Sequence, residues 1–352
     1  MPSRRTLLAL GAGAALAAAA AALSWRAREP AVSPTFVDAA GRSVFVPGQV
    51  SRIFAAGPPA SMLLYAVAPE KMLGWARAPS DAAKAYLATP YRDLPAYGML
   101  TGRGNTASLE QVISLAPDMI LDCGEIDRTY ASLADRVQRQ TGVPYVQLNG
   151  AFGETARTLR VMGKLLGVDE HAARLANYAD DVTRAIVAFA QPSRKRARIY
   201  YGRGAEGLET GRRGSLTTEL IELVAENVAA SAGAGGLTNV SPEQILLWNP
   251  DIIIAQDVRF RDALYADGRW ISLRAVRERR VFVQPSLPFG WIDSPPGVNR
   301  LLGALWLRSL LNDDEAGDVL RTSVRAFYDL FYHVRLSDPQ MDVLLMGARN
   351  GR

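Results

Sequence analysis

An internal repeat constrains this 352-residue chain more than any other feature of its sequence. Residues 108–121 and 241–254 align without gaps, and six of their fourteen positions are identical. Both segments carry Ser-x-Glu-Gln, then Pro-Asp and a run of aliphatic residues, which is typical of a serine N-cap, a short helix, a turn and a buried strand. Two copies are too few for a solenoid, so the repeat predicts two lobes built on one plan. A chance match between two ordinary αβ units is the alternative.

Aliphatic strands alternate with helices in the rest of the chain. Strands are expected at residues 52–55, 72–75, 119–121 and 143–148 in the first half, and at 198–201, 251–255 and 280–283 in the second. Continuous aliphatic runs separated by helices are typical of parallel sheets covered on both faces. The sequence therefore predicts an α/β fold of two doubly wound lobes.

A helical stretch separates the two copies of the repeat. It is interrupted near Gly167, and its second piece, residues 170–189, is long enough to span about 30 Å and to join the lobes as a single long helix. The expected division is an export signal with a short linker (1–31), an N-terminal α/β lobe (32–153), a helical bridge (154–192), a C-terminal α/β lobe (193–335) and a C-terminal tail (336–352).

The N-terminus is typical of a targeting signal. Residues 3–8, Ser-Arg-Arg-Thr-Leu-Leu, resemble the twin-arginine export motif and lead into an Ala-rich apolar run that ends at Leu23. Residues 22–24 fit a small-residue cleavage site, and an uncleaved anchor is the alternative because the apolar run is short for a span of ~30 Å. The single cysteine, Cys123, excludes a lipid-modified N-terminal cysteine. We therefore expect a periplasmic protein that is not a lipoprotein.

Two histidines and one cysteine limit the chemistry open to the chain. They exclude an internal disulfide and the usual Cys and His zinc sites, and any histidine-dependent triad would rest on His171 or His333 alone. We therefore expect no catalytic residue, no protein-held metal and no cofactor, with a secreted α/β hydrolytic enzyme as the rival class. The first 31 residues contribute +3 of the formal charge of +5, so the body shows no nucleic-acid footprint.

Ligands of doubly wound sheets bind beyond the carboxyl ends of the strands, where loops and helix N-termini converge. Four loops rich in Gly or Pro qualify: 56–61, 97–105, 201–214 and 286–296. Their arginines suit an anion, and their aromatic side chains suit a flat ligand. Arg212 is expected to support the residues that contact the ligand, without contacting it directly. The candidate ligand-binding residues are Pro59, Ser61, Tyr97, Arg103, Tyr201, Arg203, Arg259, Phe289 and Trp291.

With the repeat, residues 38–42, 53–61 and 293–303 make the chain similar to the periplasmic substrate-binding proteins of ABC importers for iron–siderophores, haem and cobalamin. The resemblance covers residues 35–335. It implies a ligand cleft between the lobes, an inner-membrane ABC permease and its ATPase as partners, and a metal chelate, first of all a ferric siderophore, as ligand. In that family one acidic residue on each lobe docks with the permease. Glu110 and Glu243, equivalent in the repeat, are the candidates here.

Other ligands stay open at this point. Molybdate or tungstate would suit the same arginines and helix N-termini. Haem, cobalamin and a nickel chelate are further alternatives, although haem would need a tyrosine as its axial ligand. Because the chain is poor in metal-binding side chains, we expect any metal to arrive already chelated. A sensor or binding subunit anchored by residues 7–23 is the remaining alternative.

Overall fold

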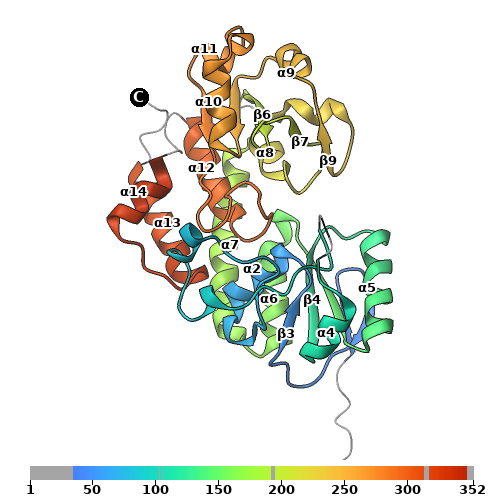
Figure 1. The fold of residues 1–352 in the computed structure, drawn as a ribbon. Coiled ribbons are helices and arrows are strands. Elements are labelled where there is room, and N and C mark those ends of the chain that lie inside the picture. Colours follow the sequence, from blue (N-terminus) through green and yellow to red (C-terminus); the bar gives the residue numbers. More distant parts are fainter. Residues whose placement is uncertain (1–34, 103, 105, 192–194, 313–316, 347–352) are drawn as a thin grey trace, which may run out of the picture.

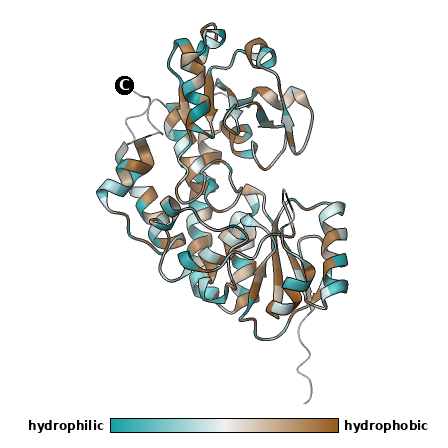
Figure 2. Cartoon of the chain, in the orientation of Figure 1, coloured by the Kyte–Doolittle hydropathy of each residue, from teal (hydrophilic) through white to brown (hydrophobic). Residues whose placement is uncertain are grey.

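The computed structural model describes residues 35–102, 104, 106–191, 195–312 and 317–346. Two α/β lobes lie one above the other in Figure 1, linked by the helices α6 (Thr155–Leu166) and α7 (Asp169–Phe189). This is the predicted two-lobed α/β architecture. The strands are mostly apolar in Figure 2, whereas the surrounding helices carry both apolar and polar residues, as expected for sheets covered by amphipathic helices.

The N-terminal lobe is built on a parallel sheet in the order β3 (Ile53–Ala55), β4 (Met119–Gly124), β5 (Tyr145–Asn149). An antiparallel hairpin, β1 (Thr35–Val37) and β2 (Ser43–Phe45), precedes it. Its α-helices are α2 (Pro58–Val67), α3 (Asp81–Lys84), α4 (Leu109–Leu115) and α5 (Arg128–Thr141). The expected strand at 72–75 forms only isolated bridges, which join Met72 to Ile53 and Trp75 to Ala96.

The C-terminal lobe holds a four-stranded parallel sheet in the order β11 (Val281–Val283), β10 (Ile252–Ala255), β6 (Arg198–Gly202), β8 (Glu226–Asn227). An antiparallel pair, β7 (Glu209–Gly211) and β9 (Leu237–Asn239), accompanies it. Its helices are α8 (Glu219–Val224), α9 (Pro242–Trp248), α10 (Val258–Ala266) and α11 (Arg274–Arg277). The three strands expected here are confirmed, whereas the two- and three-residue strands β7, β8 and β9 are too short to give a sequence pattern.

The two copies of the repeat adopt the same local structure. Helices α4 and α9 each begin at a serine whose hydroxyl accepts a hydrogen bond from the backbone N–H three residues on, at 3.1 Å for Ser108 and 3.3 Å for Ser241. Each helix ends at a residue with left-handed backbone, Ala116 in one copy and Asn249 in the other. The repeat is therefore a structural equivalence between the lobes.

The aspartate of each repeat attaches its helix–strand unit to the first strand of its lobe. The Asp118 carboxylate accepts the N–H of Arg52 at 2.9 Å, and the Asp251 carboxylate accepts the N–H of Arg198 at the same distance. The two arginine side chains then donate to carbonyls at the end of the repeat helix. Both attachments lie at the amino ends of the parallel strands, so the loops at the carboxyl ends remain available for a ligand.

Helix α7 is the predicted long bridge. Helix α6 ends at Leu166, and Gly167 takes a left-handed backbone with φ of 69° before α7 begins. At 21 residues, α7 spans roughly 30 Å. Its inner face, which includes Leu175, Val182 and Ile186, is buried, and α12 (Arg300–Asn312) packs along it.

The chain returns to the N-terminal lobe after the second sheet. Helix α13 (Gly317–Phe331) packs against α2, and the Tyr65 hydroxyl of α2 donates to the carbonyl oxygen of Tyr332 at 2.5 Å. The segment expected as a tail contains a further helix, α14 (Asp338–Met346), with Met341 and Leu344 buried. This helix has only nine residues, too few turns for its apolar residues to give a clear helical pattern in the sequence.

Arg300, at the start of α12, bonds to both lobes. Its side chain is 1% exposed and lies 2.7 Å from the carboxylate of Glu219 in the C-terminal lobe. Its guanidinium also donates to the carbonyl oxygen of Gly150, which directly follows β5 of the N-terminal lobe. The Glu219 carboxylate in turn accepts the N–H of Phe152 at 2.9 Å. We call this Arg300–Glu219 pair and its carbonyl and N–H partners the interlobe clasp.

We predict that Glu219→Gln destabilises the protein by roughly 2–4 kcal/mol, because it leaves a buried guanidinium without its carboxylate. Urea unfolding measures the change. Arg157→Gln is the control, since it removes an exposed ion pair with Glu154 and should cost less than about 1 kcal/mol. Equal effects of the two substitutions would show that the clasp does not hold the lobes together.

Both histidines bind the C-terminal end of α2. Nε2 of His171 lies 3.0 Å from the carbonyl oxygen of Ala66, and Nε2 of His333 lies 3.0 Å from that of Tyr65. The last carbonyls of a helix have no intrahelical donor, so the two rings cap α2 and tie it to α7 and to the segment after α13. Burial lowers the pKa of His333; the hydrogen bond to Tyr65 opposes this, and the nearby ring of His171 lowers the pKa further.

Because the pKa of His333 is lower in the folded than in the unfolded chain, the unfolded chain binds more protons in the acid range. The stability due to the neutral ring is complete above about pH 6.5 and is lost as the pH falls below that value. We expect Tm to fall between about pH 7 and pH 5. His333→Gln keeps an N–H donor without a titrating ring, so its Tm should fall less over this range. Parallel Tm curves for the two proteins would contradict the assignment.

Candidate functional site

The segment after β11, residues 284–299, carries the C-terminal lobe onto the N-terminal lobe. The ring of Phe289 packs against Trp75 with 6.1 Å between the ring centroids. Gly297 lies so close to Met62 that a Cβ at this position would stand 2.7 Å from the methionine Cε. The interlobe clasp follows directly at Arg300. The loop expected to carry aromatic ligand contacts is thus a packed junction between the lobes.

The loop after β3 offers little to an anion. Pro58 and Pro59 occupy the first two positions of α2 and supply no N–H groups, and Pro59 is half-buried. Ser61 is 2% exposed, and its hydroxyl accepts the N–H of Ala76 at 2.9 Å. Both residues therefore shape the start of α2, and the two prolines leave fewer N–H donors for an anion at this helix N-terminus.

The loop of residues 97–105 is anchored on the end of β3. The N–H groups of Leu100 and Thr101 both donate to the carbonyl oxygen of Ala56, at 2.7 and 3.0 Å. Tyr97 is half-buried, with its ring edge against Gly74. Arg103 lies outside the described residues.

Arg203 is engaged by two carboxylates. Its guanidinium pairs with Glu209 and lies 2.6 Å from the carboxylate of Asp293, which is itself buried. Burial works to lower the pKa of Arg203, but the negative charges of Asp293 and Glu209 outweigh it and raise that pKa above its ordinary value. The expected anion contact is therefore already neutralised by this chain's own side chains.

The other candidates of the C-terminal lobe are also occupied. Tyr201 and Trp291 are fully buried, and Phe289 lies between Trp75 and Tyr332. Arg259 is exposed and pairs with its neighbour Asp257. Because a buried ring presents no face to a ligand, this conformation does not support stacking of a flat molecule on Tyr201 or Trp291.

Within the described residues, β7 and the turn after it hold polar groups that have no hydrogen-bond partner. Thr210 is fully buried and Ser215 is 2% exposed, and neither hydroxyl has a hydrogen-bond partner among the described residues. Nε of Arg212 is also buried without a partner, and Gly233 and Gly236 lie against its side chain. Unsatisfied buried donors in one turn indicate a missing partner such as water or an anion.

The turn lies close to the lobe junction, because the carbonyl oxygen of Leu216 accepts a hydrogen bond from Arg300 of the interlobe clasp. The sequence run Thr-Gly-Arg-Arg-Gly marked this turn, but Arg203 was ranked above Arg212. The fold shows that Arg203 is paired, whereas the side chain of Arg212 has no partner among the described residues.

Within the described residues, no group of three or more His, Cys, Asp and Glu side chains is placed to hold a metal ion. Cys123 is buried, and burial raises the pKa of its thiol to about 12, with the charge of Asp122 adding to the shift. The neutral thiol neither attacks a substrate nor binds a metal at physiological pH. Over the same part of the chain, no helix has both the length and the apolar character of a membrane span.

The family of the chain follows from its sequence profile as well as its shape. The family described as "Periplasmic binding protein" matches residues 63–287, which include both copies of the repeat, the α7 bridge and the turn after β7. The chain belongs to this periplasmic binding protein family.

Similar proteins agree with this membership. The molybdate-binding protein MolA of Haemophilus influenzae is 31% identical over 142 residues, and the uncharacterized ABC transporter substrate-binding lipoprotein YvrC of Bacillus subtilis is 26% identical over 188 residues. These matches cover 39% and 51% of this chain, and only 39% and 59% of the relatives. A solved ABC transporter solute binding protein from Sulfurospirillum deleyianum is 28% identical, with a TM-score of 0.79 over 89% of this chain and 99% of that one.

In this periplasmic binding protein the two expected docking residues occupy equivalent places. Glu110 and Glu243 are both exposed in the first turn of their repeat helices, one on each lobe. The hydrogen bond from Ser241 lowers the pKa of Glu243, and the Glu243 backbone N–H and Arg269 lower it further. The carboxylate on the C-terminal lobe is therefore charged at neutral pH.

Proposed function

We propose that this chain is the substrate-binding component of an ABC importer and that it captures an anionic ligand at the junction of its two lobes. The family membership and the full-length likeness to a solute binding protein of an ABC transporter support this role. The turn of residues 210–215, with its unsatisfied guanidinium and hydroxyls, carries the proposal about the site. Recognition and delivery, without a chemical step, are the whole activity.

A small tetrahedral oxyanion of the molybdate or tungstate class is the ligand that suits this turn best. Arg212 supplies a half-buried cation that suits an oxyanion. The hydroxyls of Thr210 and Ser215 are buried in the same segment and would have to become accessible to donate to the anion. A relative that is 31% identical over part of its length is named for molybdate binding, which also favours this class.

A metal chelate, with a ferric siderophore first and haem, cobalamin or a nickel chelate after it, is the second candidate. Arg212 would serve its acidic groups equally well. The aromatic surface expected to stack on such a chelate supports this candidate less, because Trp291 is buried and Phe289 packs between Trp75 and Tyr332. In either case the metal arrives within the ligand, since the described residues offer no cluster that would hold it alone.

A hydrolytic enzyme is the less favoured class. Nε2 of His171 and of His333 each bonds to a helix carbonyl, and Nδ1 of His171 lies 3.3 Å from Arg174. Both rings are therefore engaged in holding α2, and neither is free to activate a nucleophile. The single thiol is buried and protonated.

The partners proposed are the inner-membrane permease and its ATPase, and the proposed location is the periplasm. Residues 1–31 would direct twin-arginine export, whether the signal is then cleaved or kept as an anchor. Glu110 and Glu243 present one exposed carboxylate on each lobe, and we propose that both pair with basic side chains of the permease.

We expect molybdate and tungstate to raise Tm in a thermal-shift panel that also contains sulfate, a ferric siderophore, haem, cobalamin and nickel–histidine. Arg212→Gln should weaken the bound oxyanion at least about tenfold, because it removes a charge-assisted hydrogen bond. Arg213→Gln, on the exposed neighbouring residue, is the matched control.

A Tm increase with a chelate and not with the oxyanions would select the second candidate. Unchanged affinity in Arg212→Gln would remove the 210–215 turn from the site. No Tm change with any compound, together with hydrolase activity, would overturn the receptor itself.

We predict that Glu110→Lys and Glu243→Lys each reduce uptake in a reconstituted importer at least about tenfold, because each places a like charge against a basic permease surface. Ligand affinity of the isolated protein should stay unchanged. Glu170→Lys is the control, since Glu170 is an exposed glutamate in the first turn of α7 and lies outside the repeat. Equal uptake by all three variants would exclude the docking role.

A further inference from the structure

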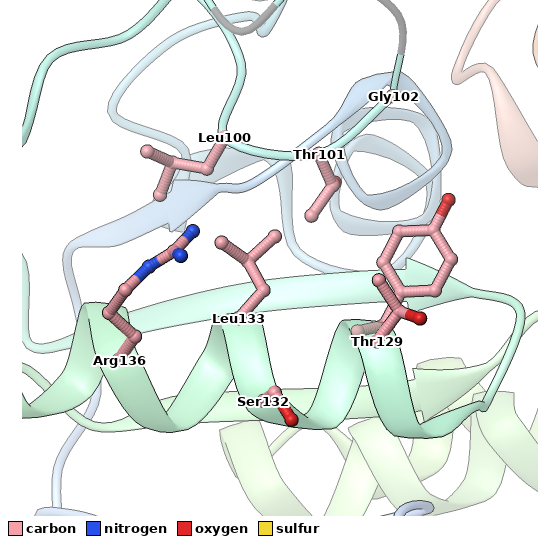
Figure 3. Close-up of a pocket in the computed structure, with 8 residues that line it drawn as sticks. Leu100, Thr101, Gly102, Thr129, Ser132, Leu133 and Arg136 are labelled. Atoms are coloured by element: carbon pink, nitrogen blue, oxygen red, sulfur yellow. The ribbon is translucent and has the colours of Figure 1, made fainter.

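A pocket of about 340 Å³ lies entirely within the N-terminal lobe, between residues 100–102 and helix α5. Figure 3 shows Leu133 and Arg136 projecting from α5 toward the loop that carries Leu100 and Thr101. The pocket shares no residue with the 210–215 turn, the interlobe clasp or the repeat. The proposed transport site therefore does not account for this pocket.

The roof of this pocket is fixed. Besides the two backbone hydrogen bonds to Ala56, the hydroxyl of Thr101 donates to the buried carboxyl group of Asp122 at 3.1 Å. Gly57 packs so tightly below Thr101 that a Cβ there would stand 2.6 Å from the threonine hydroxyl. The floor is the regular helix α5. Both walls thus belong to rigid parts of the lobe, which is the condition for a preformed ligand site.

The lining of this pocket joins one cation to apolar walls. Leu100 and Leu133 supply the apolar surface. Within the described part of the chain, the guanidinium of Arg136 and the hydroxyl of Ser132 have no hydrogen-bond or ion-pair partner. Tyr130 adds a phenol whose pKa is raised, mainly by burial, so that it remains a neutral donor.

The carboxyl group nearest the roof does not oppose an anion strongly. Asp122 is buried, and this burial raises its pKa despite the hydrogen bonds from Tyr145 and Thr101. A raised pKa means that the neutral form is favoured more than in an ordinary aspartate. Glu125 and Asp127 also act on Tyr130, and the positive charge of the pocket lining is confined to Arg136.

We propose that this pocket binds a small organic carboxylate with a single ring or a short branched chain as its apolar body. The carboxylate accepts two hydrogen bonds from Arg136, and the body lies between Leu100 and Leu133. A volume of about 340 Å³ is at the lower end of small-molecule sites, which favours one ring over a larger ligand. The site is separate from the lobe junction and does not depend on the transport ligand.

Isothermal titration of the full-length protein with sodium benzoate tests the proposal. Benzoate should bind, benzamide should bind about tenfold or more weakly because it lacks the charge, and Arg136→Gln should weaken benzoate by a similar factor. Arg139→Gln, one turn further along α5 and outside the pocket lining, should leave benzoate affinity unchanged. Circular dichroism of both variants checks that α5 is intact.

Absence of benzoate binding overturns the proposal, as does equal binding by wild type and Arg136→Gln. Inorganic phosphate is the second probe. If it binds as tightly as benzoate, the apolar walls play no part and the proposed ligand class is wrong. All of these outcomes concern residues of the N-terminal lobe, so they leave the oxyanion site at the lobe junction untouched.

Discussion

The buried guanidinium of Arg300 determines how the two lobes meet. Removing such a group from water is costly unless its donors are satisfied, and here they reach the Glu219 carboxylate, a carbonyl of the C-terminal lobe and a carbonyl of the N-terminal lobe. A large rotation between the lobes would break at least one of these bonds and leave the buried guanidinium without a full set of partners. The α7 bridge resists the same motion, so the proposed ligand capture would involve only modest closure around this edge.

Arg203 and Arg212, near the carboxyl ends of the second sheet, have different charged neighbours. Arg203 faces Asp293 and Glu209, so this group carries more negative than positive charge. Among the described residues the side chain of Arg212 forms no ion pair and lies against Gly233 and Gly236, while the Glu222 carboxylate accepts the N–H of Gly214 in the same turn at 2.9 Å. Arg203 holds the neighbouring loops in place, and the proposed oxyanion would bind on the Arg212 side of the turn.

The sequence predicted correctly the structural features that depend on residues close together in the chain. The serine caps, the Pro-Asp turn and the break at Gly167 each depend on residues within a few positions, and all three are confirmed. The surroundings of the candidate site residues depend instead on contacts between distant parts of the chain. Arg203 is neutralised by Asp293, ninety positions away in the chain, and Trp291 is buried by helices that follow it, so neither outcome leaves a mark in the surrounding sequence. Composition suggested arginine and aromatic contacts, but it could not say which were already engaged.

The helix–strand repeat gives both lobes the same architecture and leaves the loops at the opposite end of each sheet free to differ. In each lobe the repeat aspartate is joined to the arginine at or just before the start of the first parallel strand. The aspartate carboxylate accepts the arginine N–H, and the arginine carbonyl accepts the aspartate N–H, at the amino ends of the strands. Those bonds set the register of the sheet and involve no loop at the opposite end. The carboxyl ends were thereby free to diverge, and they did: the N-terminal lobe carries Gly57 and Pro58 there, and the C-terminal lobe carries Arg203 and the 210–215 turn. The proposed oxyanion site therefore belongs to the second lobe, whose loops at this end carry the charged side chains.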